Sequence, residues 1–233
     1  MDNTKDILYS ISRTLENDNR NKYTFFASNF NARNYRVITK TEFLLKSKGL
    51  EIPAFIKNFI EDNSEVLMIF NNISGKSNGV LFRSLDKKEF SNFGFSKGMF
   101  YGLGDLDENF KYGDPIILVE GAIDRDTCAK FISKNCLALL TSRLSNNQVE
   151  VLKRLTNKII LLLDNDEVGI QGEENIKKKF KETDLMFIYQ IAKEPSIKDL
   201  GDLIDLYRFK NPKFNDIINY YRVGVEAFGG KLC

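Results

Sequence analysis

The stretch IILLLDND at residues 159–166 decides how this chain of 233 residues folds. A second stretch, IILVEG at residues 116–121, has the same form: an apolar run that breaks on an acidic residue. Each run is too short for a helix of its own, and its β-branched and leucine residues favour a strand buried on both faces of a parallel sheet. Open α/β sheets bind ligands beyond the carboxyl ends of their strands. We therefore expect Glu120, Asp164 and Asp166 to meet at one edge of the sheet.

Apolar runs alternate with helical patterns through the second half of the chain. The expected strands are residues 116–120, 137–140, 159–164 and 185–189, and the expected helices lie near residues 124–134, 145–156 and 167–181. Alternation at this spacing predicts right-handed crossovers and a mostly parallel sheet flanked by helices. The fold class is therefore α/β.

The texture of the sequence changes along the chain and predicts four regions. Helix-like patterns predict a helical N-terminal region over residues 1–64, and short apolar segments separated by glycines predict a small, mostly antiparallel β subdomain over residues 65–113. The α/β domain follows over residues 114–195, and a short helical tail covers residues 196–233. The part before the α/β domain is therefore expected to be a small α+β subdomain.

Composition is that of a packed globular protein with no strong overall charge. Hydrophobic residues make up 42% of the chain and aromatic residues 12%, with 19 Phe and no Trp. The net charge is +2, so attraction for nucleic acid has to come from a local basic patch. No apolar run is as long as a membrane span, and the N-terminus lacks the pattern of a signal peptide. We expect a cytoplasmic protein without membrane contact, in the host cytoplasm if a phage encodes it.

The absence of histidine narrows the chemistry. The chain has three cysteines without CxxC spacing and no His, which argues against a structural zinc site and excludes histidine-based catalysis. Catalysis would have to use carboxylates, basic side chains and a metal ion. Three converging carboxylates repel one another, and a hard divalent cation such as Mg²⁺ or Mn²⁺ relieves that repulsion. The alternative is that these acids only cap the N-termini of helices. The occurrence of three acidic motifs one after another along the chain favours a metal site instead.

The acidic motifs resemble those of the topoisomerase–primase (toprim) domain over roughly residues 114–205. The first is VEGAID at residues 119–124, the second is LDNDEVG at residues 163–169, and KD follows at residues 198–199. We expect the glycine after Glu120 to allow a tight turn that exposes the carboxylate. The resemblance implies that Glu120, Asp164 and Asp166 are catalytic residues and metal ligands.

The third motif departs from the pattern of bacterial primases, which usually show Lys-Asp-Pro-Asp. This chain lacks the proline and has one more residue before the second acid. The resemblance implies that Asp199 is a metal ligand or supports one, whereas Asp202 could equally be a solvated helix residue. The sequence does not decide whether Asp202 or Asp124 joins the site.

A basic segment upstream resembles the one that leads into the toprim domain of bacterial and phage primases. It comprises GVLFRSLDKKEF at residues 79–90 and GMFYGL at residues 98–103. The resemblance implies that cations here bind nucleotide and template phosphates, with Arg83 and Lys88 as the best matches and Lys87 and Lys97 as further candidates. The alternative for Lys87 and Lys88 is a solvated turn.

Together these resemblances imply the catalytic core of a phage-like DNA primase. Such a nucleotidyltransferase uses ribonucleoside triphosphates and a divalent ion to make short RNA primers on single-stranded DNA. Because no zinc ribbon or helicase motif is present, a separate helicase or zinc-bearing replication protein is expected as a partner. The alternatives are a toprim-type metal-dependent nuclease and a non-catalytic DNA-binding scaffold of replication or recombination.

Overall fold

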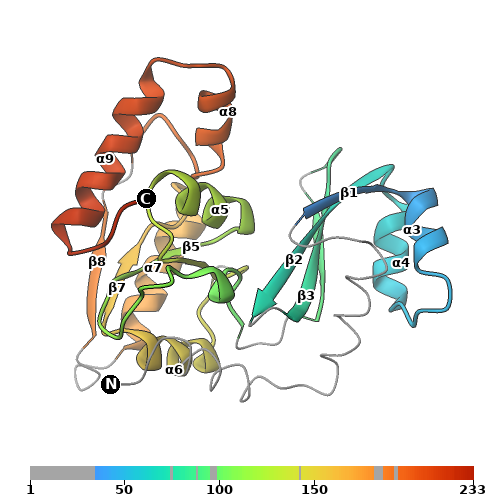
Figure 1. Ribbon diagram of the computed structural model, residues 1–233, viewed down its shortest axis with the longest axis horizontal. Coiled ribbons are helices and arrows are strands. Elements are labelled where there is room, and N and C mark those ends of the chain that lie inside the picture. Colours follow the sequence, from blue (N-terminus) through green and yellow to red (C-terminus); the bar gives the residue numbers. More distant parts are fainter. Residues whose placement is uncertain are drawn as a thin grey trace. The chain divides into compact units, whose positions relative to one another are not determined.

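The computed structural model describes most of the chain as two compact units (Figure 1). The described residues are 35–73, 76–87, 89–94, 99–141, 143–180, 186–191 and 194–233, without the side chains of residues 72–78. One unit contains the described residues up to 94, and the other contains those from 99 onward. We refer to them as the antiparallel unit and the parallel unit.

The antiparallel unit is a sheet of four strands with two helices. Its strands are β1 (Tyr35–Thr39), β2 (Glu65–Ile73), β3 (Lys76–Ser84) and β4 (Phe90–Phe93), in the spatial order β1-β2-β3-β4. All neighbouring strands run antiparallel, as the sequence predicted for the region after residue 64. The helices are α3 (Lys40–Lys46) and α4 (Ala54–Glu61).

The core of this unit lies between the helices and one face of the sheet. Alternate residues Val66, Met68 and Phe70 of β2 are buried there, as the two-residue period of a strand requires. Phe43 of α3 meets Phe82 of β3 edge to face, with the ring centroids 6.0 Å apart. The two helices are thereby held on the sheet.

Strand β1 differs from the helix expected over residues 1–64. Residues 35–39 read YRVIT, in which β-branched residues are frequent, and every one of them pairs with β2. Ile38 is 1% exposed and joins the core of the unit. Residues 1–34 of that expected helical region lie outside the described residues.

The boundary between the units falls near residue 96, earlier than the expected residue 113. The reason is that the segment after Gly98 is bonded to the parallel unit. Tyr101 and Ala138 exchange two backbone hydrogen bonds of 3.1 and 3.0 Å. The buried guanidinium of Arg125 adds an ion pair of 3.4 Å to Asp105 and donates to the carbonyl of Gly102.

The parallel unit is an α/β sheet in the order β6-β5-β7-β8, with every neighbouring pair parallel. The predicted α/β class is therefore confirmed. Its strands are β5 (Ile116–Val119), β6 (Cys136–Ala138), β7 (Lys158–Leu161) and β8 (Phe187–Gln190). Its helices are α5 (Ala122–Phe131), α6 (Asn146–Leu155), α7 (Glu167–Lys179), α8 (Asp202–Arg208) and α9 (Lys213–Ala227), with a short 3₁₀ turn at Leu103–Asp105.

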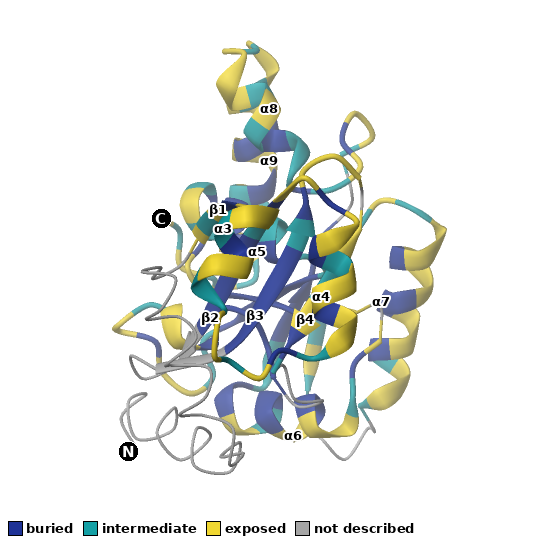
Figure 2. Ribbon diagram, turned by 90° about the vertical axis from the view of Figure 1, so that its right-hand side faces the viewer, coloured by how far each residue is buried: buried dark blue, intermediate teal, exposed yellow. Residues whose placement is uncertain are grey.

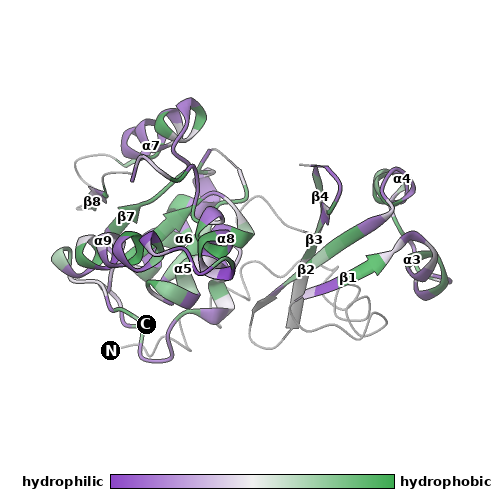
Figure 3. Ribbon diagram, turned by 90° about the horizontal axis from the view of Figure 1, so that it is seen from above, coloured by the Kyte–Doolittle hydropathy of each residue, from purple (hydrophilic) through white to green (hydrophobic). Residues whose placement is uncertain are grey.

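Helices lie on both sides of this sheet. Seen from above, α7 lies on one side of β7 and β8, and α5 and α9 lie on the other (Figure 3). All four residues of β5 are buried, which explains why its sequence is apolar throughout rather than alternating. Helices α6 and α7 each bury one side and expose the other (Figure 2). Among the described residues, no helix is long and apolar enough to span a membrane.

Strand β7 ends three residues before Asp164, whereas the sequence predicted a strand up to that residue. Leu162 still donates a backbone hydrogen bond of 3.0 Å to Leu118, but β5 itself ends at Val119. The described pairing of β7 with both β5 and β8 ends at Leu161. Asp164 is therefore carried on a loop at the end of the sheet.

Candidate metal centre

The first two acidic motifs are bonded to each other at the carboxyl ends of β5 and β7. The backbone N–H of Asp164 donates to Oε1 of Glu120 at 3.3 Å. The carbonyl of Glu120 accepts a bond of 2.9 Å from the N–H of Leu140, which follows β6. Three adjacent strand ends therefore determine where the Glu120 carboxylate lies.

The second motif is in turn bonded to the third. Asp166 caps the N-terminus of α7, where its Oδ1 accepts from the N–H of Gly169 at 3.0 Å. The N–H of Asn165 donates to the carbonyl of Lys198 at 2.6 Å. Helix capping and metal binding are thus compatible for Asp166, because the cap uses one oxygen only.

The loop that carries Asp199 is tied to helix α5 through Asp124. The N–H of Gly201 donates to Oδ1 of Asp124 at 2.8 Å, and Oδ2 of Asp124 accepts from Gly121 at 3.1 Å. Asp202 has a local role, since its Oδ2 accepts from the N–H of Lys198 at 2.8 Å. The structure therefore gives Asp124 the task of joining the first and third motifs, and Asp202 that of closing the loop.

Two glycines provide room for these carboxylates. A Cβ on Gly169 would lie 2.1 Å from the carbonyl oxygen of Asp164 and 2.9 Å from Oε1 of Glu120. A Cβ on Gly121 would lie 2.4 Å from Oδ2 of Asp124. The chain turns from β5 into α5 within Glu120 and Gly121, as predicted, although Gly121 itself has an extended backbone with φ −97°. The missing side chain of Gly121 also lets the Asp124 carboxylate approach the backbone.

The gathered carboxylates change one another's protonation. The pKa of Asp164 is raised to about 7. Burial is the largest cause, followed by the negative charges of Glu120, Asp124, Asp199 and Asp166. Burial, and then the charge of Asp199, raise the pKa of Asp124 to about 6. Negative charge is therefore concentrated here to a degree that favours binding of a cation.

Lys198 already supplies one positive charge to this cluster. Its Nζ lies 3.1 Å from Oδ2 of Asp166, and both side chains are accessible to solvent. Hydrogen bonds from Gly169 and then from Lys198 lower the pKa of Asp166. As the pH falls through about 7, Asp164 therefore takes up a proton while Asp166 stays ionised.

The donor set fits a hard divalent cation. Glu120, Asp164, Asp166 and Asp199 offer only carboxylate oxygens, which Mg²⁺ and Mn²⁺ prefer over nitrogen or sulfur ligands. Within the described part of the chain, no three His, Cys, Asp or Glu side chains already form a ligand set. The carboxylates would have to turn toward a shared ion. Their assignment as ligands therefore stays a prediction.

The predicted phosphate-binding residues belong to the antiparallel unit or lie outside the description. Arg83 is partly buried on β3, where it pairs with Leu67 and Phe90. Lys87 donates from Nζ to the carbonyl of Asp62, at the end of α4, at 3.4 Å. Lys88 and Lys97 lie outside the described residues. The phosphate contacts of all four stay predictions.

Lys198 is a residue of the candidate centre that the sequence analysis did not single out. It was part of the third motif, but only the acid beside it was treated as a site residue. A lysine next to an expected metal ligand was the available signal.

Comparison with protein families gives one match. Residues 117–204 match the family described as Toprim-like. The match covers all three acidic motifs and thus the whole candidate metal centre. A search of curated proteins found no match.

Comparison with solved structures gives primase catalytic domains. A DnaG primase catalytic domain bound to single-stranded DNA is 16% identical with a TM-score of 0.56, covering 96% of this chain and 79% of that one. An Aquifex aeolicus primase with zinc-binding and RNA polymerase domains is 18% identical with a TM-score of 0.55, covering 93% and 60%. A DNA primase domain from Pseudomonas aeruginosa is 23% identical with a TM-score of 0.50, covering 62% and 50%.

These findings confirm the resemblance that the acidic motifs predicted. The parallel unit has the toprim fold, and the chain resembles primase catalytic cores in structure. At these levels of identity the likeness is one of fold. The chain spans about half the length of the Pseudomonas aeruginosa structure.

Proposed function

We propose that this chain is the catalytic core of a phage-like DNA primase. It would synthesise short RNA primers on single-stranded DNA by metal-dependent nucleotidyl transfer. One observation carries the proposal most strongly: hydrogen bonds from backbone N–H groups to the carboxylates of Glu120 and Asp124 and to the carbonyl of Lys198 join all three acidic motifs at one end of a parallel sheet. The Toprim-like match over the same residues supports it.

Glu120, Asp164, Asp166 and Asp199 would hold Mg²⁺ or Mn²⁺. When bound, such ions neutralise the triphosphate and activate the attacking 3′ hydroxyl. Hydrogen bonds between the loops that carry these carboxylates would fix where the ions lie. Asp124 contributes indirectly, since it holds helix α5 against the loop of Asp199.

Asp164 would couple ion binding to proton release. Its pKa of about 7 means that a substantial fraction is protonated near neutral pH before an ion binds. A carboxylic acid is a poor ligand, so the proton has to leave as the ion enters. Activity should therefore rise with pH on the acid side of neutrality.

Cationic side chains would hold the phosphates of substrates. An incoming nucleotide carries a triphosphate that a metal ion alone does not neutralise, and arginine and lysine supply the rest. Arg83, Lys87, Lys88 and Lys97 are the candidates, with Lys198 added by its place beside Asp166. If a metal ion binds Asp166, the ammonium group of Lys198 would be released from that carboxylate and could contact a substrate phosphate.

The expected partner is a separately encoded helicase or zinc-bearing replication protein. The related Aquifex aeolicus structure contains a zinc-binding domain besides its RNA polymerase domain. Residues 1–233 contain no histidine and no CxxC, so they do not themselves form such a zinc-binding module. Primer yield with and without cognate replication proteins would measure that dependence.

The deciding experiment incubates the protein with single-stranded DNA, labelled ribonucleotides and Mg²⁺ or Mn²⁺. Short RNA products that are absent with Asp164→Asn would support the proposal. Degraded template without RNA products would instead identify a nuclease that uses the same carboxylates. DNA binding with neither product, even with replication partners present, would indicate a non-catalytic role.

A further inference from the structure

Helices α5 and α8 both begin at the carboxylate cluster and both end at a group of aromatic rings. Their N-termini are linked where Gly201 donates to Asp124. At their other ends, the rings of Phe131, Tyr207 and Phe214 lie with centroids 5.1 to 5.3 Å apart. Helix α5 has 10 residues, so this ring group lies about 15 Å from the cluster.

Beyond the ring group, the turn between α8 and α9 exposes another aromatic side chain to solvent. Phe209 is 80% exposed, the highest value for any large hydrophobic residue in the described part of the chain, and Tyr207 is 50% exposed. The turn projects from the parallel unit as an exposed segment (Figure 2). Burial in the fold therefore does not explain the presence of a phenylalanine here.

The backbone of the turn is held in a specific conformation. Lys210 has a positive φ of 49°, which is uncommon for a residue other than glycine. Asn211 donates to the carbonyl of Leu206 at 2.9 Å and Phe209 to that of Asp205 at 2.9 Å, which close the end of α8. The Phe209 ring is thus presented from a defined turn.

Cations surround these rings. The Nζ of Lys130 lies 4.8 Å from the ring centroids of both Phe131 and Tyr207. Arg208, Lys210 and Lys213 are exposed, and residues 206–215 contain no acid. Lysine is depleted at the centre of protein interfaces, whereas ring faces beside cations are what single-stranded nucleic acid requires.

We propose that this surface binds single-stranded nucleic acid. It consists of Lys130, Tyr207, Arg208, Phe209, Lys210 and Lys213, and we call it the aromatic–basic turn. Bases stack on the exposed rings and backbone phosphates contact the cations, which gives binding with little sequence preference. The proposal rests on the proposed function only for the choice of DNA as the strand, which would pass about 15 Å from the carboxylate cluster along α5.

The test measures fluorescence anisotropy of a labelled oligothymidylate with the full chain in EDTA and without nucleotides. The Phe209→Ala variant should bind the oligonucleotide about tenfold more weakly than the unaltered chain, because one base loses the ring on which it stacks. Phe209→Leu should bind as weakly, because it keeps apolar area but has no ring face, and Phe209→Tyr should bind normally. Arg208→Ala should reduce the slope of log affinity against log salt by about 0.7.

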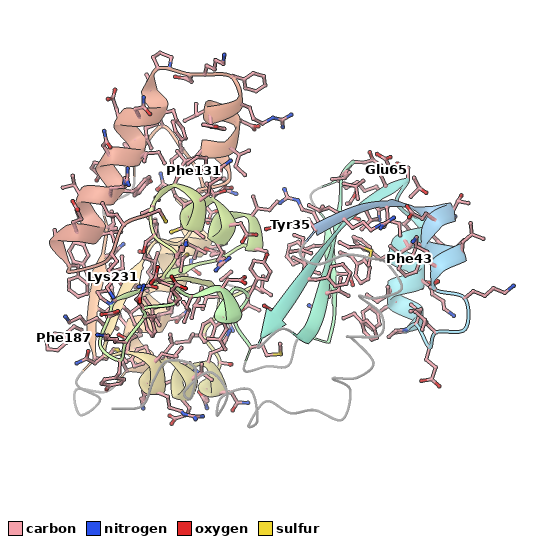
Figure 4. All side chains as sticks on the ribbon, viewed as in Figure 1. Tyr35, Phe43, Glu65, Phe131, Phe187 and Lys231 are labelled. Carbon is pink, nitrogen blue, oxygen red and sulfur yellow. The ribbon has the colours of Figure 1, made fainter. Side chains whose placement is uncertain are left out.

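Phe187→Ala is the matched control. Phe187 is 58% exposed on β8, in the same unit, and Figure 4 shows it far from Phe131. Equal DNA affinities of the Phe209→Ala and Phe187→Ala variants would overturn the proposal. The proposal would also be overturned if the unaltered chain did not bind DNA at low salt. The same holds if Phe209→Ala bound DNA normally and lost only binding to a protein partner. Unchanged melting temperatures would confirm that the variants fold.

The same measurement separates this proposal from the proposed function. Asp164→Asn should bind the oligonucleotide normally in EDTA, since stacking on the turn does not use the carboxylates. If binding depends on Phe209 but no primer is made, the aromatic–basic turn stands and the primase assignment fails. If primers are made but Phe209→Ala binds the oligonucleotide normally, the primase assignment stands and the aromatic–basic turn fails.

Discussion

The Nζ of Lys198 lies 3.1 Å from Oδ2 of Asp166, so the carboxylate cluster contains a cation from the chain itself. The hydrogen bond to Asp166, followed by the negative charges of Asp166, Asp164 and Asp199, raises the pKa of Lys198. This lysine would compete with a divalent ion for the same oxygens. The chain thus carries a built-in counter-charge that reduces repulsion when no ion is bound.

We expect Lys198→Ala to bind Mn²⁺ more tightly than the unaltered chain. Both partners are accessible to solvent, so the gain should be about two- to fivefold, the range of an exposed ion pair. Isothermal titration calorimetry would measure it. Lys178→Ala, at the far end of α7, should leave the affinity unchanged. Weaker Mn²⁺ binding by Lys198→Ala would mean that Lys198 orders the loop rather than competing with the ion.

Glu120→Gln and Asp164→Asn should abolish metal-dependent activity and leave the fold intact. Each removes one negative oxygen donor and one source of repulsion, so the metal-free protein should melt at the same or a higher temperature. Primer synthesis at saturating metal and thermal melting in EDTA are the two measurements. Near-normal turnover by either variant would remove that residue from the metal centre.

The stability of the metal-free protein should fall as pH rises from about 4 to about 7. Asp164 has a pKa of about 7 when folded, against an ordinary value of 3.8. The folded state therefore holds a proton that the unfolded state releases, and stability decreases with pH across that window. Asp164→Asn should show a flatter profile in melting experiments in EDTA. An equally steep profile in that variant would assign the effect to other groups.

Mn²⁺ affinity should rise as pH increases toward 7 and level off above it. One proton leaves Asp164 for each ion bound, so the increase should approach about tenfold per pH unit on the acid side. Calorimetry in buffers of different ionisation enthalpy would count the released protons. Binding without proton release would show that Asp164 is already ionised in the free protein.

Gly169→Ala should disrupt the metal centre. The new Cβ would lie 2.1 Å from the backbone oxygen of Asp164, and backbone cannot move aside as a flexible side chain can. We expect a loss of about 1–3 kcal/mol in stability, as for other overpacked sites, and weaker Mn²⁺ binding. Gln171→Ala, exposed on the same helix, is the control. Normal Mn²⁺ affinity in Gly169→Ala would mean that the loop of Asp164 can shift without cost to the site.

Arg83→Ala should weaken binding of nucleotide or template while leaving Mn²⁺ affinity unchanged. Loss of one phosphate contact on a single strand should also reduce the salt slope by about 0.7. Lys57→Ala, an exposed change on α4 of the same unit, is the matched control. Unchanged affinities for both ligands would remove Arg83 from the predicted phosphate site.

Several parts of the structure could be predicted from sequence because they depend on local pattern. The apolar runs before Glu120 and Asp164 are strands buried on both faces, and β-strand periodicity and burial leave few other conformations for such runs. Parallel strands bring their carboxyl ends to one edge, so the convergence of the acids followed from their position after the runs.

Other features required contacts between distant residues. The bond from Gly201 to Asp124 joins residues 77 positions apart, and the ion pair of Lys198 with Asp166 depends on how two loops pack. Residues 35–39 are a strand because β2 offers backbone partners. Local sequence determined which residues reach the sheet edge. Only the tertiary structure decided which of them bind one another, because hydrogen bonds between loops depend on positions that packing sets and that no local pattern encodes.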